Sequence, residues 1–178
     1  MKYCSQCAAP VVFRVPSGDT LKRHVCDVCG EIHYQNPRII TGCIPEWQGR
    51  ILLCRRAIEP RHGLWTIPAG FMENGETVEQ AAMRETLEEA CANVEISELY
   101  AVYNIPHVNQ VYMIFRAKLL GGEFAPGVES LETVLFEEPD IPWDEMAFPV
   151  VVRSLQRFFA DRPGNRFPPF VDTIVPQH

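Results

Sequence analysis

The segment from Gly70 to Ala92, GFMENGETVEQAAMRETLEEACA, restricts the fold of this 178-residue chain more than any other. Within it, the run Thr77-Val78-Glu79-Gln80 has the pattern of a capping box, which predicts that a helix begins there. Residues three and four apart share one side of a helix, so Glu85, Glu88 and Glu89 lie on one stripe. Like charges at this spacing destabilise an isolated helix by roughly 0.2–0.5 kcal/mol per pair.

Two interpretations of this acidic stripe remain open. Carboxylates are hard oxygen ligands, so a bound Mg²⁺ or Mn²⁺ would offset their repulsion. Alternatively, the helix is an ordinary solvated one, in which Arg84 and Glu88 form an i,i+4 ion pair. In either case an apolar side of the helix is expected to pack on a sheet. That side comprises Met83, Leu87, Ala90, Cys91 and Val94.

Four of the seven cysteines predict a small metal-stapled unit at the N-terminus. They form two Cys-x₂-Cys pairs separated by eighteen residues, Cys4 with Cys7 and Cys26 with Cys29. Two such turns can aim four thiolates at one Zn²⁺, and four protein ligands leave no open position, so the ion is expected to be structural. Disulfides are the alternative, less expected in a chain without a secretory signal. We therefore predict a zinc ribbon over residues 1–35.

Composition sets bounds on the rest of the chain. With 47% hydrophobic residues, it can bury one sizeable core beside the small ribbon. No apolar run reaches membrane-spanning length, and no segment resembles a signal peptide, so a cytoplasmic protein is expected. A formal net charge of −7 argues against a general nucleic-acid binder. The other three cysteines, Cys43, Cys54 and Cys91, are interpreted as buried small hydrophobes.

Hydrophobic patterns predict a mixed α and β domain over residues 36–160. Residues 38–57 indicate two strands joined by a Gln48-Gly49 turn, and residues 94–106 and 108–120 indicate two more. Residues 149–162 fit a second helix. Its buried side comprises Val151, Leu155, Phe158 and Phe159. Residues 161–178 are proline-rich and are interpreted as a C-terminal tail.

The acidic helix and its approach resemble the Nudix box, the signature of hydrolases that cut nucleoside diphosphates linked to another moiety. The resemblance is carried by residues 63–70 and by Gly70, Glu76, Arg84, Glu85, Glu88 and Glu89. Two places depart from the family pattern: Thr86 replaces a large aliphatic residue, and Cys91-Ala92 replaces a Gly followed by an aliphatic residue. The resemblance covers nearly the entire chain. It implies an α+β fold, the Nudix α/β/α sandwich with a mixed sheet.

The same resemblance implies a division of labour among these residues. Glu85, Glu88, Glu89 and the carbonyl of Ala69 would ligate Mg²⁺, which activates water and polarises the diphosphate. Arg84 would orient a carboxylate, and Glu76 would fix the loop against the helix. In several related pyrophosphatases the general base lies outside the box, and Glu129 and Glu132 are the best-placed candidates. Ordinary surface carboxylates are the alternative for both.

The resemblance also implies a small-molecule nucleotide as the substrate. NADH pyrophosphatases share the ribbon, but their SQPWPFP-like signature is absent, whereas residues 111–148 resemble the branch linked to FAD and ADP-ribose. We expect hydrolysis of one of these to release AMP. NADH hydrolysis, RNA decapping and a non-catalytic nucleotide sensor, whose ribbon would bind nucleic acid or protein, are alternatives. Related enzymes are often homodimers, so a dimer is expected.

Three further residues are candidates for substrate contact. Arg55 and Arg56 end a predicted strand and are placed to meet phosphate, with surface ion pairs as the alternative. Trp65 lies close to the predicted catalytic loop in sequence. It is expected either to shape the pocket or to pack in the core.

Overall fold

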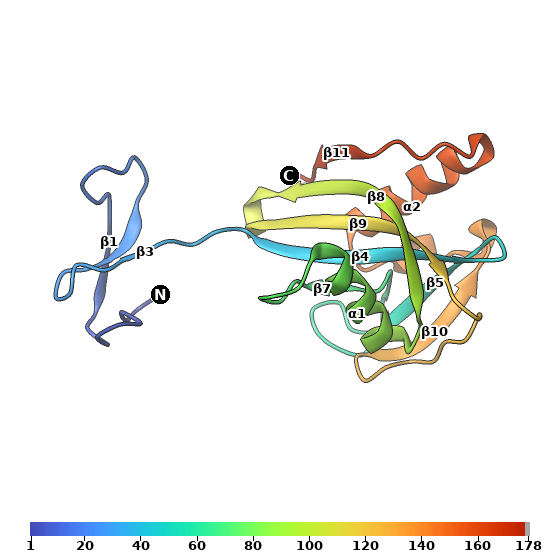
Figure 1. Cartoon of the computed structure of the whole chain (residues 1–178), viewed down its shortest axis with the longest axis horizontal. Helices are drawn as coiled ribbons and strands as arrows, with labels where there is room; N and C mark the ends of the chain where they lie inside the picture. The colour runs from blue at the N-terminus through green and yellow to red at the C-terminus, as the bar shows by residue number, and fades with distance from the viewer. Residues whose placement is uncertain (177–178) are drawn as a thin grey trace. The chain divides into compact units, whose positions relative to one another are not determined.

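The cysteine-rich segment forms a unit of its own. The structure is a computed structural model that describes residues 1–176, and it separates Met1–Asn36 from the rest of the chain (Figure 1). The strands of the small unit form an antiparallel sheet in the order β1-β2-β3. They are β1 (Val11–Arg14), β2 (Arg23–Cys26) and β3 (Ile32–His33). This small antiparallel sheet agrees with the ribbon that the sequence predicted.

The unit that begins at Pro37 is built on an eight-stranded mixed sheet. Its main path runs β10-β5-β4-β9-β8-β11, with β6 paired to β5 and β7 to β4. Strands β4 and β9 run parallel, as do β8 and β11. The bounds are β4 (Arg38–Trp47), β5 (Arg50–Arg56), β6 (Trp65–Thr66), β7 (Ala69–Phe71), β8 (Val94–Ile105), β9 (Gln110–Leu119), β10 (Ser130–Phe136) and β11 (Phe170–Thr173).

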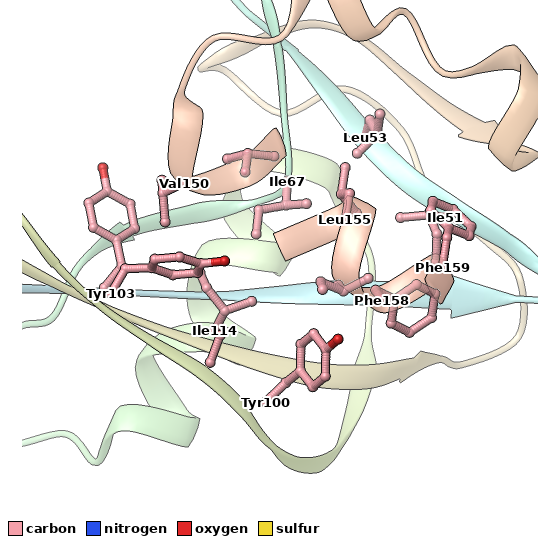
Figure 2. Close-up of a cluster of buried hydrophobic side chains, with 14 of the residues drawn as sticks. Ile51, Leu53, Ile67, Tyr100, Tyr103, Ile114, Val150, Leu155, Phe158 and Phe159 are labelled. Carbon is pink, nitrogen blue, oxygen red and sulfur yellow. The ribbon is translucent and has the colours of Figure 1, made fainter. Parts of the chain in front are cut away.

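Helices cover both faces of this sheet, which confirms the α/β/α sandwich. The helices are α1 (Val78–Ala90) and α2 (Pro149–Asp161). Alternation along β5 separates two cores: Ile51 and Leu53 pack with α2, whereas Leu52 and Cys54 pack with α1. Figure 2 shows the core under α2, where the Phe158 ring lies close to Tyr100. Within residues 1–176, no helix is long and apolar enough to cross a membrane.

Short connections complete the fold, and the sequence predicted one of them, the Gln48-Gly49 turn. Gln48 and Gly49 both have positive φ, as a two-residue hairpin turn between β4 and β5 requires. Four short 3₁₀ helices join other elements: η1 (Pro106–Val108), η2 (Glu138–Asp140), η3 (Trp143–Glu145) and η4 (Arg162–Gly164).

The start of α1 follows the predicted capping box. The Thr77 hydroxyl accepts from the Gln80 backbone N–H at 3.2 Å, and the Gln80 side chain accepts from the Thr77 N–H at 2.8 Å. The predicted packing side is confirmed at Ala90 and Val94, which are buried. It is wrong at Met83, which is 37% exposed, and at Leu87, which is 49% exposed.

A different stripe of α1 is buried, and it is built from small and polar residues. It comprises Ala81, Ala82, Glu85, Thr86, Glu89 and Ala90. The small side chains let the helix approach β4 closely, where the Thr41 hydroxyl donates to the carbonyl of Val78 at 2.9 Å. Thr86 fits its fully buried position because its hydroxyl donates to the Ala82 carbonyl at 2.8 Å. Packing thus takes Glu85 and Glu89 inward, whereas Glu88 stays exposed.

The chain leaves α1 through Cys91, which is exposed rather than buried as predicted. Its φ of 46° and ψ of 32° place it in the left-handed region, and its N–H donates to the Leu87 carbonyl at 2.9 Å. This geometry explains why glycine suits the position. Ala92, next in the chain, is fully buried, and the predicted burial of Cys43 and Cys54 is confirmed.

Part of the segment interpreted as a tail belongs to the sheet. Strand β11 pairs with β8 in parallel, with Phe170 opposite Ala101. The Phe170 ring packs edge-to-face on Tyr100 and Tyr103 at centroid distances of 5.3 and 5.5 Å. The proline-rich composition of this segment did not predict these aromatic contacts. The last two residues of the predicted tail lie outside the described residues.

Replacing Cys91 by glycine should stabilise the unit from Pro37 onward. Glycine adopts the left-handed conformation without the Cβ penalty, so we expect the free energy of unfolding to rise by about 1 kcal/mol. All three tryptophans lie in this unit, so urea denaturation followed by tryptophan fluorescence reports on it alone. Cys91→Ala is the control and should not stabilise. An equal gain from alanine would contradict the conformational explanation.

Candidate active site

Two carboxylates of α1 are buried against β7. Glu85 is 9% exposed and Glu89 is 5% exposed. The Glu89 carboxylate accepts from the backbone N–H of Ala69 at 3.1 Å. The Glu85 carboxylate fills the space where a Cβ on Gly70 would lie, so a side chain there would displace it. Gly70 is therefore needed for the close approach between strand and helix.

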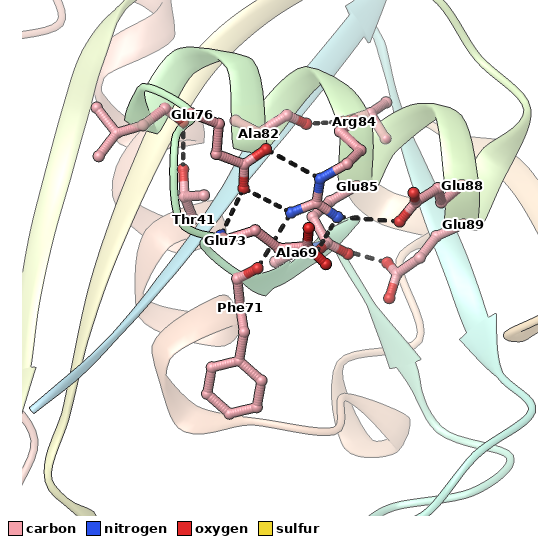
Figure 3. A network of polar contacts seen from close by, with 12 residues as sticks. Thr41, Ala69, Phe71, Glu73, Glu76, Ala82, Arg84, Glu85, Glu88 and Glu89 are labelled. Atoms are coloured by element: carbon pink, nitrogen blue, oxygen red, sulfur yellow. Dashed lines mark hydrogen bonds and ion pairs between the residues drawn. The ribbon is translucent and has the colours of Figure 1, made fainter.

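Arg84 connects the helix to the loop that precedes it (Figure 3). Its Nε and Nη2 donate to the two oxygens of Glu76 at 3.0 and 2.8 Å, and Nη2 also donates to the Phe71 carbonyl at 3.1 Å. Its Nη1 donates to Glu85 at 2.8 Å and to Glu88 at 3.0 Å. Glu76 further accepts from the Glu73 N–H at 2.6 Å, which closes the loop. One guanidinium thus orients three carboxylates.

Electrostatics separate the carboxylates into two kinds. Hydrogen bonds from Arg84 lower the pKa of Glu76 to about 2, so it is ionised. Burial raises the pKa of Glu89 to about 8, with a further contribution from the Glu85 charge against the opposing Ala69 N–H. Burial also raises the pKa of Glu85. A buried carboxylate with a raised pKa gains most from a cation placed beside it.

The carboxylates fit a hard divalent cation. Within residues 1–176, Glu89 forms no ion pair with a basic side chain, although its neighbours Glu85 and Glu88 pair with Arg84. A bound Mg²⁺ or Mn²⁺ would supply the missing positive charge to oxygen ligands of the preferred type. Glu85, Glu88 and Glu89 project from one stripe of α1, and the Ala69 peptide lies against Glu89.

A loop ahead of β10 brings Glu129 to this site. The backbone N–H of Gly127 donates to the Glu89 carbonyl at 3.0 Å, and that of Ala125 donates to the Ala90 carbonyl at 2.9 Å. Burial is the main cause of the raised pKa of Glu89, and the charge of Glu129 adds to it. Glu132 instead lies 3.8 Å from the guanidinium of Arg55.

The remaining sequence candidates are divided between surface and core. Arg55 donates through Nε to the Gly63 carbonyl at 2.9 Å, in addition to its contact with Glu132. Burial raises the pKa of Glu89, and the charge of Arg56 acts in the opposite direction. Trp65 is buried in the core under α2, where its ring packs edge-to-face on Phe136 at 5.0 Å.

The four cysteines of the small unit converge on one point. The sulfur atoms of Cys4, Cys7, Cys26 and Cys29 all lie within 4.8 Å of one another. None of them is disulfide-bonded: Sγ of Cys4 is 3.6 Å from that of Cys29, and Sγ of Cys7 is 3.5 Å from that of Cys26. Backbone N–H groups of the second pair lower the pKa of Cys26 to about 7, which favours the thiolate. Four thiolates fit a closed tetrahedral zinc site.

Two contributors near the site were not identified from the sequence. Gly127 is required because a Cβ there would overlap the Glu88 carbonyl. The Pro126-Gly127 dipeptide, a turn signal, was the available hint. Phe148 lies beside Arg56, with the guanidinium 5.2 Å from its ring centroid. No sequence pattern indicates this contact, because it joins the start of α2 to the end of β5.

Comparison with known proteins agrees with this geometry. The NUDIX domain family matches residues 36–154, and the Nudix N-terminal zinc-ribbon family matches residues 2–35. A NUDIX hydrolase from Nitrosomonas europaea has a crystal structure that superposes with a TM-score of 0.95 at 57% identity, over 98% of this chain and 99% of that one. The chain therefore belongs to the Nudix family. It is a hydrolase that acts on pyrophosphate bonds.

Relatives with named activities are more distant. The ADP-ribose pyrophosphatase of Methanocaldococcus jannaschii is 33% identical over 115 residues, which cover 61% of this chain and 67% of that protein. The NAD-capped RNA hydrolase of Chromobacterium violaceum is 33% identical over 132 residues, covering 74% of this chain and 48% of that protein. This chain thus spans about half the length of the RNA hydrolase it matches.

The raised pKa of Glu89 makes the stability of the magnesium-free protein depend on pH. Its folded pKa of about 8 exceeds the unfolded value of about 4.3, so its stabilising contribution is present in full below pH 4 and is lost as pH rises towards 8. At pH 8.5, Glu89→Gln should therefore raise the free energy of unfolding by ~1–3 kcal/mol, and the gain should shrink by pH 5. Urea denaturation at both pH values measures this. A gain independent of pH would contradict the assignment.

Proposed function

We propose that this enzyme cleaves the diphosphate of FAD or ADP-ribose, releasing AMP, with Mg²⁺ or Mn²⁺ at the α1 carboxylates. The observation that carries the proposal is the buried pair Glu85 and Glu89, held against Gly70 and Ala69 while Glu89 has no basic partner within residues 1–176. Similarity to a protein named ADP-ribose pyrophosphatase supports this substrate class.

The chain's own groups fit hydrolysis by direct water attack. A divalent ion, when bound, would polarise the phosphate oxygens and lower the pKa of water. Glu85, Glu88 and Glu89 would hold it. Arg84 donates to Glu85, Glu88 and Glu76 and keeps these carboxylates in place. Glu129, which is exposed beside Glu89, is assigned to accept the proton of the attacking water. The new oxygen–phosphorus bond then replaces the bridging bond, and the two monophosphates leave.

Hydrolysis of NAD-type substrates is a second candidate. The zinc-ribbon match and the similarity to NAD-capped RNA hydrolases favour including NADH and capped RNA in any assay. A non-catalytic nucleotide sensor would bind these compounds without cleaving them.

Turnover should depend on Glu89. We expect purified protein with Mg²⁺ to release AMP from FAD or ADP-ribose faster than from NADH or capped RNA, as measured by chromatography. Glu89→Gln should lower kcat by about 10²–10³-fold, because it removes an ionised oxygen from the metal site. Glu79→Gln makes the same change on an exposed part of α1 and should leave kcat near the wild-type value. Wild-type turnover in Glu89→Gln would refute the assignment.

The cysteine cluster is proposed to hold one structural zinc ion. Elemental analysis should find one zinc per chain, and Cys26→Ser should lose it because three thiolates no longer close the site. Chelation should raise hydrogen exchange in β2, since a unit this small has little core of its own. Tryptophan fluorescence should stay unchanged, because all three tryptophans lie from Pro37 onward. A zinc-free protein with two disulfides would contradict the proposal.

A further inference from the structure

Arg56 is held at two points where β5 ends. Its Nε donates to the Pro60 carbonyl at 2.9 Å, and its guanidinium carbon lies 5.2 Å from the centroid of the Phe148 ring. The backbone there is also fixed, because Arg56 N–H donates to the Leu64 carbonyl at 2.9 Å and its carbonyl accepts from Gly63 at 2.8 Å. The guanidinium is therefore held at Nε by a hydrogen bond and on its face by the Phe148 ring.

The outer nitrogens of this arginine remain available. Within the part of the chain that the structure describes, no hydrogen bond or ion pair joins Nη1 or Nη2 of Arg56 to another group. Arg55, by contrast, contacts the Glu132 carboxylate through Nη1 at 3.8 Å. A guanidinium whose fork is free and whose plane is fixed suits two-point binding of a phosphate.

The position of Arg56 relative to the acidic cluster fits that use. Ser130 of β10 pairs with Arg56, and in the loop just ahead of β10 the Gly127 N–H donates to the Glu89 carbonyl at 3.0 Å. A diphosphate bound at the carboxylates and their divalent ion would then meet Arg56 as a second, separate binding group. Binding energy from both sides would fix the phosphates for attack.

Phe148 is itself rigidly placed. The N–H of Ala147 donates to the Trp65 carbonyl at 2.8 Å, and the Phe148 carbonyl accepts from Val151 at 3.0 Å in the first turn of α2. The ring lines a cavity of about 20 Å³ together with Ala69 and Tyr112. Ala69 is the residue whose N–H meets Glu89, so this cavity adjoins the catalytic loop.

We propose that Phe148 is a positioning residue whose ring holds the Arg56 guanidinium in the orientation that binds the substrate diphosphate. The inference rests on the proposed function for the identity of the ligand. It assigns Phe148 a role through Arg56, without contact to the reacting atoms. A cation–π contact of this kind contributes about 0.5–1 kcal/mol at an exposed site, which corresponds to about a twofold to fivefold change in binding.

A double-mutant cycle tests this coupling. Phe148→Leu should raise KM for the best diphosphate substrate by about twofold to fivefold with little change in kcat, whereas Phe148→Tyr should restore the wild-type KM because it keeps the ring. In an Arg56→Ala background, Phe148→Leu should have no further effect. If Phe148→Leu fails to fold, Phe148→Met takes its place in the cycle.

A matched aromatic pair elsewhere provides the control. Arg157 lies 3.9 Å above the ring of Phe170, and Phe170→Leu should leave KM unchanged although it removes a similar contact. The same cycle is measured on the dissociation constant of ADP with Mg²⁺, so that it does not require turnover. The inference would be overturned if the effects of Phe148→Leu and Arg56→Ala on KM multiplied independently. It would also be overturned if Phe148→Leu and Phe148→Tyr changed KM equally. If Phe148 and Arg56 were coupled in ADP binding but no substrate were hydrolysed, the proposed function would be refuted and the role of Phe148 would stand.

Discussion

The close approach of α1 to β7 is the constraint on which the rest of the site depends. Gly70 lacks the atom that would displace the Glu85 carboxylate, and the Ala69 N–H meets Glu89 across the same contact. Small residues on the inner stripe of α1 allow the helix to lie this near the sheet. As a result two carboxylates are buried, which is costly without a compensating charge. A cation bound beside them would offset that cost.

A second layer of contacts stabilises this arrangement from outside. Arg84 ties Glu76 in the loop to Glu85 and Glu88 on the helix, so that loop and helix form one polar network. At the other end, Gly127 donates to a carbonyl of the last turn of α1 and brings Glu129 beside the acidic cluster. Hydrogen bonds to backbone therefore position a carboxylate that lies 40 residues beyond Glu89 in the sequence.

Local patterns predicted the elements well, because capping and turn chemistry act between near neighbours. The Thr77 capping box, the Gln48-Gly49 turn and the buried side of α2 all follow the sequence expectation. The inner stripe of α1 did not, since an apolar count favoured Met83 and Leu87 over alanines and glutamates. Hydrophobicity alone misplaces a helix whose buried side carries small residues and carboxylates.

The sequence by itself determined the family motif, the four-cysteine pattern and the residues from which both sites are made. Spacing along one helix or within one turn is a local property, so it can be recognised from the sequence without knowledge of the tertiary structure. Only the tertiary structure decided that Arg56 meets Phe148, that Gly127 bonds to the Glu89 carbonyl and that β11 joins the sheet. These pairs are far apart in the chain, and they meet because strand pairing and helix packing bring them together.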